Sequence, residues 1–247
     1  MILNSGKTDI GQKRKTNQDA ILMLPEQHFF MVADGMGGHK GGDIASQLCA
    51  QLMQDHITLH HGKKAPKDLL SESVFRVNHG IFKEAENRPE LRGMGTTMNA
   101  LYFHKGILHL VNVGDSRTYL VQNHKIYQMT RDNSLVNEKL TTGIYTREQA
   151  KDDPQKNVLT KTVGYDPEMV PDLYQYKVVK NDLFITCSDG LYGKVSDEDI
   201  LHLIKDHIPN PSSATQEGLD ELVDQLVKLA NDNGGNDNIS VIALIAR

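Results

Sequence analysis

The chain has few of the residues that mark several common classes of protein. Only two of its 247 residues are cysteine, Cys49 and Cys187, so no disulfide framework can form and we expect two buried thiols. Its 27 basic residues are outnumbered by 32 acidic ones, and the net charge of −5 disfavours a general nucleic-acid binder. It lacks an apolar run of about 18 residues and an N-terminal charged region followed by an apolar core. These absences favour a cytoplasmic protein of enzyme size with no nucleic-acid or membrane partner.

Internal repeats and low-complexity linkers are also missing, so we expect a single domain over residues 1–247. Apolar periodicity predicts three helices, over residues 44–53, 70–81 and 219–230. Short turns between strand-like runs suggest antiparallel hairpins, and strands in runs beside long helices predict an α+β fold. The predicted strands are residues 29–33, 97–103, 107–113, 117–121, 174–179, 183–187 and 239–245.

The stretch 130–162 differs from the rest because it is polar and shows little periodicity. A structureless loop of that length is unusual inside a compact domain, so we expect a small, partly helical subdomain or flap. Thr146 is expected to cap a helix within it. An ordinary surface excursion is the alternative.

The segment from Phe29 to Gly42 joins an apolar run to an acid and a series of glycines. Residues 29–33 are typical of a buried strand, and Asp34 follows directly. A carboxylate there lies at the rim of a sheet, and the glycines after it let backbone groups approach a bound cation or phosphate. A plain strand–turn–helix junction would give the same pattern, so this segment alone leaves both interpretations open.

Three more aspartates lie at strand ends: Asp115 and Asp189 follow strand-like runs, and Asp237 precedes one. Each alone is more often a turn or cap residue. Together they would repel one another, so a cluster of them indicates neutralising cations. Hard oxygen donors without a zinc-spaced Cys/His pair favour Mg²⁺ or Mn²⁺.

Two well-known phosphate-transfer loops are missing from the chain. It contains no Gly-x-x-x-x-Gly-Lys-Ser/Thr motif, and no arginine follows Cys187 at the spacing of a cysteinyl-phosphate loop. Water activated by a dinuclear metal site is therefore the better candidate nucleophile. Arg14 could hold a phosphate with its two-pronged guanidinium, although a solvated basic turn is the alternative.

Seven short segments, listed at the end of this paragraph, match the motifs of one protein family in the same order. Through these segments, from about residue 8 to the C-terminus, the chain resembles the compact bacterial members of the metal-dependent type 2C (PPM) Ser/Thr protein phosphatases. The resemblance implies a four-layer α-β-β-α sandwich, with two antiparallel sheets flanked by helices and a flap at about 130–162 beside the substrate groove. It also implies hydrolysis of phosphoserine and phosphothreonine in proteins by metal-activated water. The segments are, in order, GQKRKTNQD, VADGMGGHKGGDIAS, GMGTT, VNVGDSR, LTKTVG, ITCSDGL and GGNDNISVI.

The resemblance further implies a dinuclear centre of Mn²⁺ or Mg²⁺, with a place for a third ion. Asp34 would bridge two ions, and Gly35 would offer its backbone carbonyl to one of them. Asp189 and Asp237 would complete the centre, directly or through water. Asp115 would hold the weaker third ion together with Asp189.

Other residues match the family's catalytic positions. Arg14 is similar to its phosphate-binding arginine, Asp19 to an acid that orients metal-bound water, and Asn238 to a residue that supports the ligands. Many eukaryotic members have a histidine, a proposed general acid, where this chain has Met36. His39 is the bacterial-type alternative, and a structural role at the helix start is the other interpretation of it.

A second departure lies at the start of the flap. Bacterial members often have Asp-His-Ser there, whereas this chain has Asp132-Asn133-Ser134, so any contact that depends on that histidine is lost.

The resemblance implies phosphorylated protein substrates, targets of a Ser/Thr kinase, and hence a role in signalling. We also expect the protein to be a monomer. Two other functions share part of the pattern. One is a hydrolase of small phosphoesters, which would use the same chemistry. The other is a non-catalytic regulatory module that binds phosphoproteins through a decayed site.

Overall fold

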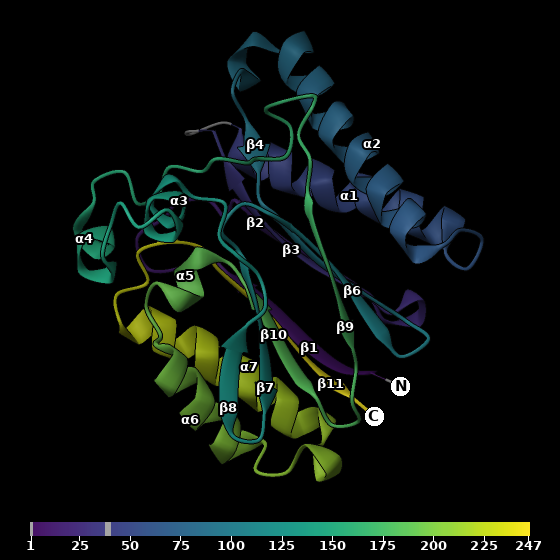
Figure 1. The fold of residues 1–247 in the computed structure, drawn as a ribbon, viewed down its shortest axis with the longest axis vertical. Coiled ribbons are helices and arrows are strands. Elements are labelled where there is room, and N and C mark those ends of the chain that lie inside the picture. Colours follow the sequence, from purple (N-terminus) through teal and green to yellow (C-terminus); the bar gives the residue numbers. More distant parts are fainter. Residues whose placement is uncertain (1, 38–40) are drawn as a thin grey trace.

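The computed structural model describes residues 2–37 and 41–247, which form two antiparallel sheets packed face to face (Figure 1). The first sheet has the strand order β1-β11-β10-β7-β8, and the second has the order β2-β3-β5-β6-β9, with the short β4 paired to β3. The first contains β1 (Ile2–Asp9), β11 (Ile239–Ala246), β10 (Leu183–Cys187), β7 (Arg117–Gln122) and β8 (Lys125–Gln128). The second contains β2 (Asp19–Leu24), β3 (Phe29–Met36), β4 (Gly95–Thr96), β5 (Met98–His104), β6 (Ile107–Val113) and β9 (Asp172–Lys177).

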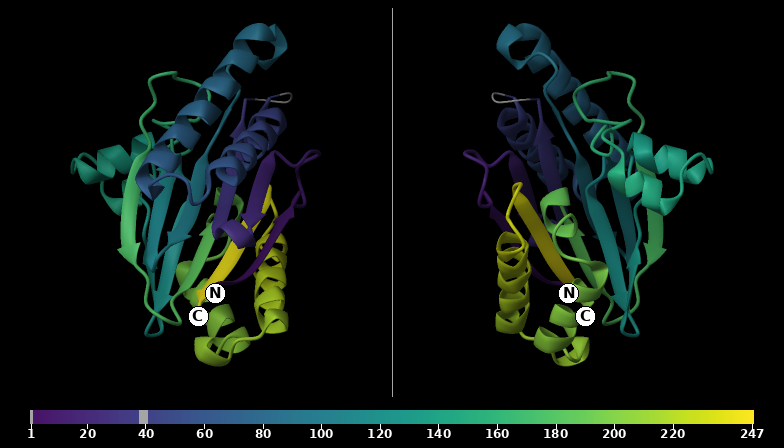
Figure 2. Two further views of the ribbon diagram at one scale, coloured as in Figure 1. Left: turned by 90° about the vertical axis from the view of Figure 1, so that its right-hand side faces the viewer. Right: turned by 90° about the vertical axis from the view of Figure 1, so that its left-hand side faces the viewer.

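Helices cover the two outer faces of the sheets. α1 (Gly42–His60) and α2 (Pro66–Asn87) lie on the second sheet, while α6 (Asp197–His207) and α7 (Gln216–Asp232) lie on the first (Figure 2). The predicted α+β sandwich of four layers is confirmed, and so are the three predicted helices, in α1, α2 and α7. None of the helices in the described ranges combines the length and the apolar character that crossing a bilayer requires.

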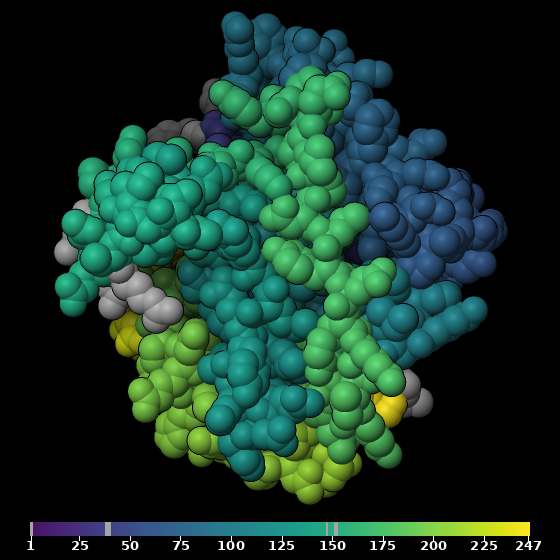
Figure 3. All heavy atoms as spheres, viewed as in Figure 1, coloured from purple at the N-terminus to yellow at the C-terminus, as the bar shows by residue number. Residues whose placement is uncertain are grey.

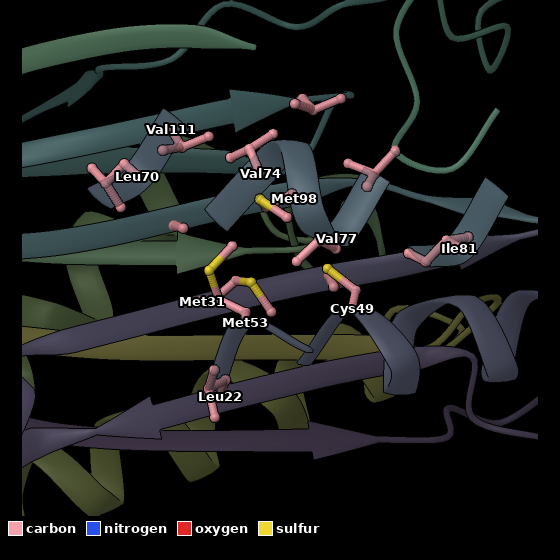
Figure 4. Close-up of a cluster of buried hydrophobic side chains, with 14 of the residues drawn as sticks. Leu22, Met31, Cys49, Met53, Leu70, Val74, Val77, Ile81, Met98 and Val111 are labelled. Atoms are coloured by element: carbon pink, nitrogen blue, oxygen red, sulfur yellow. The ribbon is translucent and has the colours of Figure 1, made fainter. Parts of the chain in front are cut away.

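The sandwich explains why β3 is apolar along its whole first half. Side chains of a strand alternate between the two faces of its sheet. Phe29 and Met31 pack under the helices α1 and α2, whereas Phe30 and Val32 pack against the other sheet. Because both faces are covered, every position must be apolar. Figure 4 shows the helix side of this core, where Met31 lies near Met53 and Cys49 of α1.

Both cysteines are buried and unpaired as predicted, Cys49 in α1 and Cys187 at the end of β10. Burial raises the pKa of each thiol to about 12, so neither is a thiolate at neutral pH. A cysteine nucleophile is therefore disfavoured by the structure as well as by the sequence.

The strand predicted at 29–33 is longer in the structure and includes the acid that was expected to follow it. β3 continues through Asp34 and Gly35 to Met36, because the two residues of β4 pair with Gly35 and Met36. The prediction placed Asp34 beyond the strand because glycine usually interrupts one. The pairing with β4 is a long-range contact that local sequence does not reveal.

The stretch 130–162 contains two short helices, α3 (Leu135–Thr141) and α4 (Arg147–Asp152), between β8 and β9. Thr146 caps α4 as predicted: its hydroxyl accepts a hydrogen bond from the Gln149 backbone N–H, and the Gln149 side chain accepts one from the Thr146 backbone. Ser134 caps α3 in a similar way. In Figure 1 these helices stand to one side of the sandwich, near the edge where β6 passes to β7.

Candidate metal centre

The acids singled out in the sequence gather at one end of the sandwich because the topology brings their strand ends together. β10 and β11 are antiparallel neighbours, so Asp189, just after β10, and Asp237, just before β11, lie at the same edge. The Ser188 backbone N–H donates to the Ser240 carbonyl at 3.0 Å and keeps the two strands paired up to the acids. Asp115 lies in the short connection by which the chain passes from β6 in one sheet to β7 in the other.

The other sheet contributes Asp34 and Asp19, which lie directly opposite each other in the register of β3 and β2. Asp19 is buried, and its Oδ2 accepts a hydrogen bond of 2.7 Å from the hydroxyl of Ser188. This bond connects the two sheets at the acidic end. The second oxygen of Asp19, Oδ1, is buried without any hydrogen-bond partner, a costly arrangement for a carboxylate.

Two glycines allow the backbone to pack closely around these acids. A Cβ atom on Gly35 would lie 1.9 Å from the carbonyl oxygen of Gly42, at the start of α1. A Cβ atom on Gly190 would lie 1.9 Å from the carbonyl oxygen of Asn238. Both neighbours are backbone atoms that cannot move aside, so the Asp-Gly pairs that the sequence showed are required by packing.

The threonines of the GMGTT segment fix the backbone of Asp34. The Asp34 N–H donates to the Thr97 hydroxyl at 2.9 Å, and its carbonyl accepts from the Thr97 N–H at 2.8 Å and from the Thr96 hydroxyl at 2.9 Å. The Thr97 hydroxyl is also 2.7 Å from that of Ser116, next to Asp115. The segment thus connects two of the acidic positions.

Asn238 holds the N-terminal loop against the site. Its Oδ1 accepts from the Gln18 N–H at 2.8 Å, and its Nδ2 donates to the carbonyls of Ile10 and Thr16 at 2.9 and 3.0 Å. Within the loop fixed in this way, Arg14 reaches Asp237, with 2.6 Å between Nη2 and Oδ2. Arg14 is exposed, as a solvated basic turn would be, but its guanidinium is also paired with an acid of the site.

Burial and mutual repulsion raise the pKa of four carboxyl groups at this end. Loss of hydration is the largest cause for each, and neighbouring aspartates add to it. The pKa of Asp19 and that of Asp115 rise to about 7, that of Asp189 rises to about 6, and that of Asp34 rises well above its ordinary value. Arg14 offsets part of this charge. Acids in such surroundings favour a bound cation over their own ionised but unpaired state.

The residues fit a hard divalent cation. All the donors are carboxylate or backbone oxygens, and the buried, unpartnered Oδ1 of Asp19 is available to a cation or its water. In the described ranges, no three His, Cys, Asp or Glu side chains already form a closed ligand group. Asp237 and Asp19 are held instead by Arg14 and Ser188.

The structure thus brings together all but one of the predicted site residues, namely Arg14, Asp19, Asp34, Gly35, Asp115, Asp189 and Asp237. His39, the proposed general acid, lies outside the described residues. One acid that the sequence did not single out shares a feature with Asp19: Asp43, in the first turn of α1, also has its Oδ1 buried without a partner in the described residues. An acid at the start of a helix, directly after the glycines that follow Asp34, was the signal that could have identified it.

Asn133, where relatives often have histidine, takes part in a compact network at the base of the flap. Its Oδ1 accepts from the Gly114 N–H at 3.0 Å, and its Nδ2 donates to Asp172 Oδ2 at 2.8 Å. Its backbone bonds to the Gly114 carbonyl and the Thr160 N–H. The asparagine therefore connects the turn that carries Asp115 to both ends of the flap segment and to β9.

Replacing Asn133 with alanine is expected to lower the free energy of unfolding by about 1–3 kcal/mol, because a buried Gly114 N–H would lose its partner. Urea denaturation of the two proteins measures the difference. Asn157→Ala, at an exposed position in the same segment, is the matched control and should change stability little. Equal stability of the Asn133 variant and the control would show that the network does not support the flap.

Comparison with known proteins agrees with this geometry. A family model described as protein phosphatase 2C matches residues 8–238. The serine/threonine phosphatase stp of Listeria monocytogenes is 34% identical over 242 residues, which are 96% of this chain and 92% of the relative.

Solved structures are similar over the whole chain. The serine/threonine phosphatase PstP/Ppp of Mycobacterium tuberculosis superposes with a TM-score of 0.89 at 31% identity, covering 100% of this chain and 99% of the other. The catalytic domain of PstP in complex with 2 manganese ions superposes with a TM-score of 0.81 at 28% identity, covering 99% and 97%.

Proposed function

Since the chain belongs to the protein phosphatase 2C family, we propose that the acids at this end of the sandwich are the centre at which it removes phosphate from proteins. The chain is a serine/threonine protein phosphatase, its reaction depends on divalent metal ions, and its substrates are phosphorylated proteins. The observation that supports the location best is the convergence of buried, mutually repelling carboxyl groups beside an arginine.

In this proposal Asp34, the Gly35 carbonyl, Asp189 and Asp237 would hold two Mn²⁺ or Mg²⁺ ions. Asp115 and Asp189 would hold a third ion, and Asp19 would orient water. The manganese complex of a structurally similar phosphatase supports the choice of metal and the number of two. When bound, the ions would neutralise the carboxylates, polarise the phosphate and supply a water of lowered pKa.

The chain's own residues position the substrate. Arg14 can exchange its contact with Asp237 for the non-bridging oxygens of a phosphate, because a metal ion would then neutralise that carboxylate. The backbone network around Asp34 keeps the acids in place, so the site needs little rearrangement when a phosphate arrives. We further propose that His39 or water protonates the leaving serine or threonine oxygen.

The substrate class can be tested against the related chemistry of small phosphoesters. We expect the protein with added Mn²⁺ to turn over a phosphothreonine peptide with a higher kcat/KM than a nucleoside monophosphate or glycerol phosphate. Steady-state phosphate release measures all three. A higher kcat/KM for the small esters would reverse the substrate assignment, and no turnover of any of them would point to a non-catalytic phosphoprotein-binding module.

We propose three further features of the biological context. The chain acts as a single domain over residues 1–247, it works as a monomer, and it opposes a Ser/Thr kinase. The continuous two-sheet core supports the first, and the function of its relatives supports the last.

A further inference from the structure

A hollow with a mixed apolar and polar lining lies beside the acidic centre and is not explained by the chemistry of phosphate removal. Its volume is about 930 Å³, and it is formed by Met36 and by the segment 157–170, which connects the flap to β9. Four large apolar side chains that line it are open to solvent: Met36 at 37%, Val158 at 46%, Tyr165 at 64% and Val170 at 70%. Figure 3 shows the segment on the surface between the flap and α2. Exposed apolar groups gathered in a hollow indicate a binding surface.

The hollow adjoins the acidic centre through β3. Met36 is the last residue of β3, two positions after Asp34, so one strand carries both an acid of the centre and a wall of the hollow. The Thr162 hydroxyl lies 3.6 Å from the Met36 sulfur and joins this wall to the opposite one. A chain that places a phosphorylated residue at the acids would therefore extend past Met36.

The walls are fixed before anything binds. Val163 pairs with Thr96 of β4 through two backbone hydrogen bonds of 3.0 and 2.9 Å. The buried Asn78 of α2 accepts from the Gly164 N–H at 2.7 Å and donates to the Asp166 carbonyl at 2.8 Å. A preformed hollow of this kind binds without a large ordering cost.

The charges at the hollow restrict what it accepts. Among the described residues that line it the one lysine is Lys161, which is paired with Asp172 at 2.5 Å. Asp166 and Glu168 are exposed at the rim, and neither carboxylate has a basic partner among the described residues. The described residues therefore give the hollow a negative field, which opposes acidic side chains and tolerates neutral or basic ones.

We propose that this hollow is a specificity site that takes a bulky apolar side chain of the substrate protein, a few residues from the phosphorylated serine or threonine. Acidic residues at the same position are rejected by Asp166 and Glu168. The inference rests on the proposed function of the neighbouring acids and specifies which phosphoproteins they serve.

Matched phosphothreonine peptides test the proposal. A single residue is changed in turn at each position on either side of the phosphothreonine, to leucine, to asparagine of similar size, or to aspartate. At one position or two neighbouring positions, the leucine peptide should have a KM roughly tenfold lower than the asparagine peptide, because a leucine side chain is buried. The aspartate peptide should have the highest KM there, and kcat should differ little.

Two surface variants assign the preference to the hollow, and each has a matched control elsewhere on the surface. Val170→Asp and Tyr165→Ser should reduce the preference for leucine to about twofold or less. Val179→Asp and Tyr127→Ser change the same residue types at exposed positions outside the hollow and should leave the preference intact. All four variants should hydrolyse p-nitrophenyl phosphate like the unaltered protein.

The outcomes separate this inference from the proposed function. Hydrolysis of p-nitrophenyl phosphate with equal KM for leucine and asparagine peptides at every position would overturn the inference alone. Absence of hydrolysis of any phosphoester by the unaltered protein would overturn the proposed function. A dimer in light scattering that Val170→Asp converts to monomer, together with no peptide preference, would show that a second copy of the chain covers the hollow, and would also overturn the inference.

Discussion

Asp34→Asn is expected to reduce phosphatase activity about a thousandfold or more, because a metal ion held by Asp34 would contribute several kcal/mol to charge stabilisation in the transition state. Metal-free, the same variant should be more stable than the unaltered protein by about 1–2 kcal/mol, since one of several buried, mutually repelling carboxyl groups is removed. Function and stability thus change in opposite directions. Phosphopeptide turnover with Mn²⁺ and urea denaturation in a chelator measure the two effects.

The stability gain has a defined dependence on pH. Folding raises the pKa of Asp34 above its ordinary value of 3.8, so the folded state binds the proton more tightly than the unfolded state. Below that value both states are protonated and Asp34 costs nothing. As pH rises above it, the unfolded state loses its proton first and the unaltered protein loses stability relative to the variant. The difference in free energy of unfolding should therefore grow from weakly acidic to neutral pH.

The matched control is Asp206→Asn, which makes the same change on the exposed face of α6. Asp206→Asn should have the activity, the response to Mn²⁺ and the free energy of unfolding of the unaltered protein at each pH. Added Mn²⁺ should raise the melting temperature of the unaltered protein and of this control but not that of Asp34→Asn. Near-normal turnover by Asp34→Asn, or unimpaired turnover by the unaltered protein in excess chelator, would disprove the proposed centre.

The sequence made Asp34 and Asp189 recognisable because each is followed by a glycine that packing restricts. After Asp34 and after Asp189 only glycine fits, because a Cβ atom there would lie 1.9 Å from a backbone carbonyl oxygen. The local sequence therefore shows a recognisable pattern at these positions, a strand followed by an acid and a glycine. The resemblance to a family then supplied the roles, which spacing alone left open between turn and ligand.

Other features depended on contacts that no local pattern shows. β1 and β2 have mixed polar and apolar residues and were not predicted, because their pairing with β11 and β3 determines them. α6 was also missed, although Ser196 caps it and three acids follow in its first turn, a signal that was present. The hollow beside Met36 was not foreseen, since its walls come from β3 and from residues more than a hundred positions later.

Asn133 shows the limit of arguing from a family pattern. The absence of the usual histidine suggested a lost contact at the flap. The structure shows that asparagine makes its own contacts there, accepting from Gly114 and donating to Asp172. A departure from a pattern identifies a position that differs, but the neighbours decide what replaces the missing interaction.

Arg14→Ala should lower kcat/KM for a phosphothreonine peptide by about 10- to 150-fold, because charge-assisted hydrogen bonds to a phosphate contribute roughly 1.5–3 kcal/mol. Mn²⁺ binding should be unchanged or tighter. In the structure the guanidinium holds Asp237 at 2.6 Å, so its removal frees a carboxylate that the proposal assigns to the metal. In this proposal Arg14 competes with the metal for Asp237 but helps to bind the substrate. Its removal should therefore lower kcat/KM without weakening Mn²⁺ binding.

Lys15→Ala is the matched control, since it removes a positive charge from the same loop at a position without a partner in the described residues. It should change neither quantity by more than about twofold, the effect of a single exposed charge. Arg14→Lys should be intermediate in kcat/KM, because the charge remains but the two-pronged geometry is lost. Calorimetric titration measures the affinity of each variant for Mn²⁺, and steady-state kinetics measures its kcat/KM. Weaker Mn²⁺ binding with an unchanged kcat/KM in Arg14→Ala would mean that the arginine supports the acids and does not hold the phosphate.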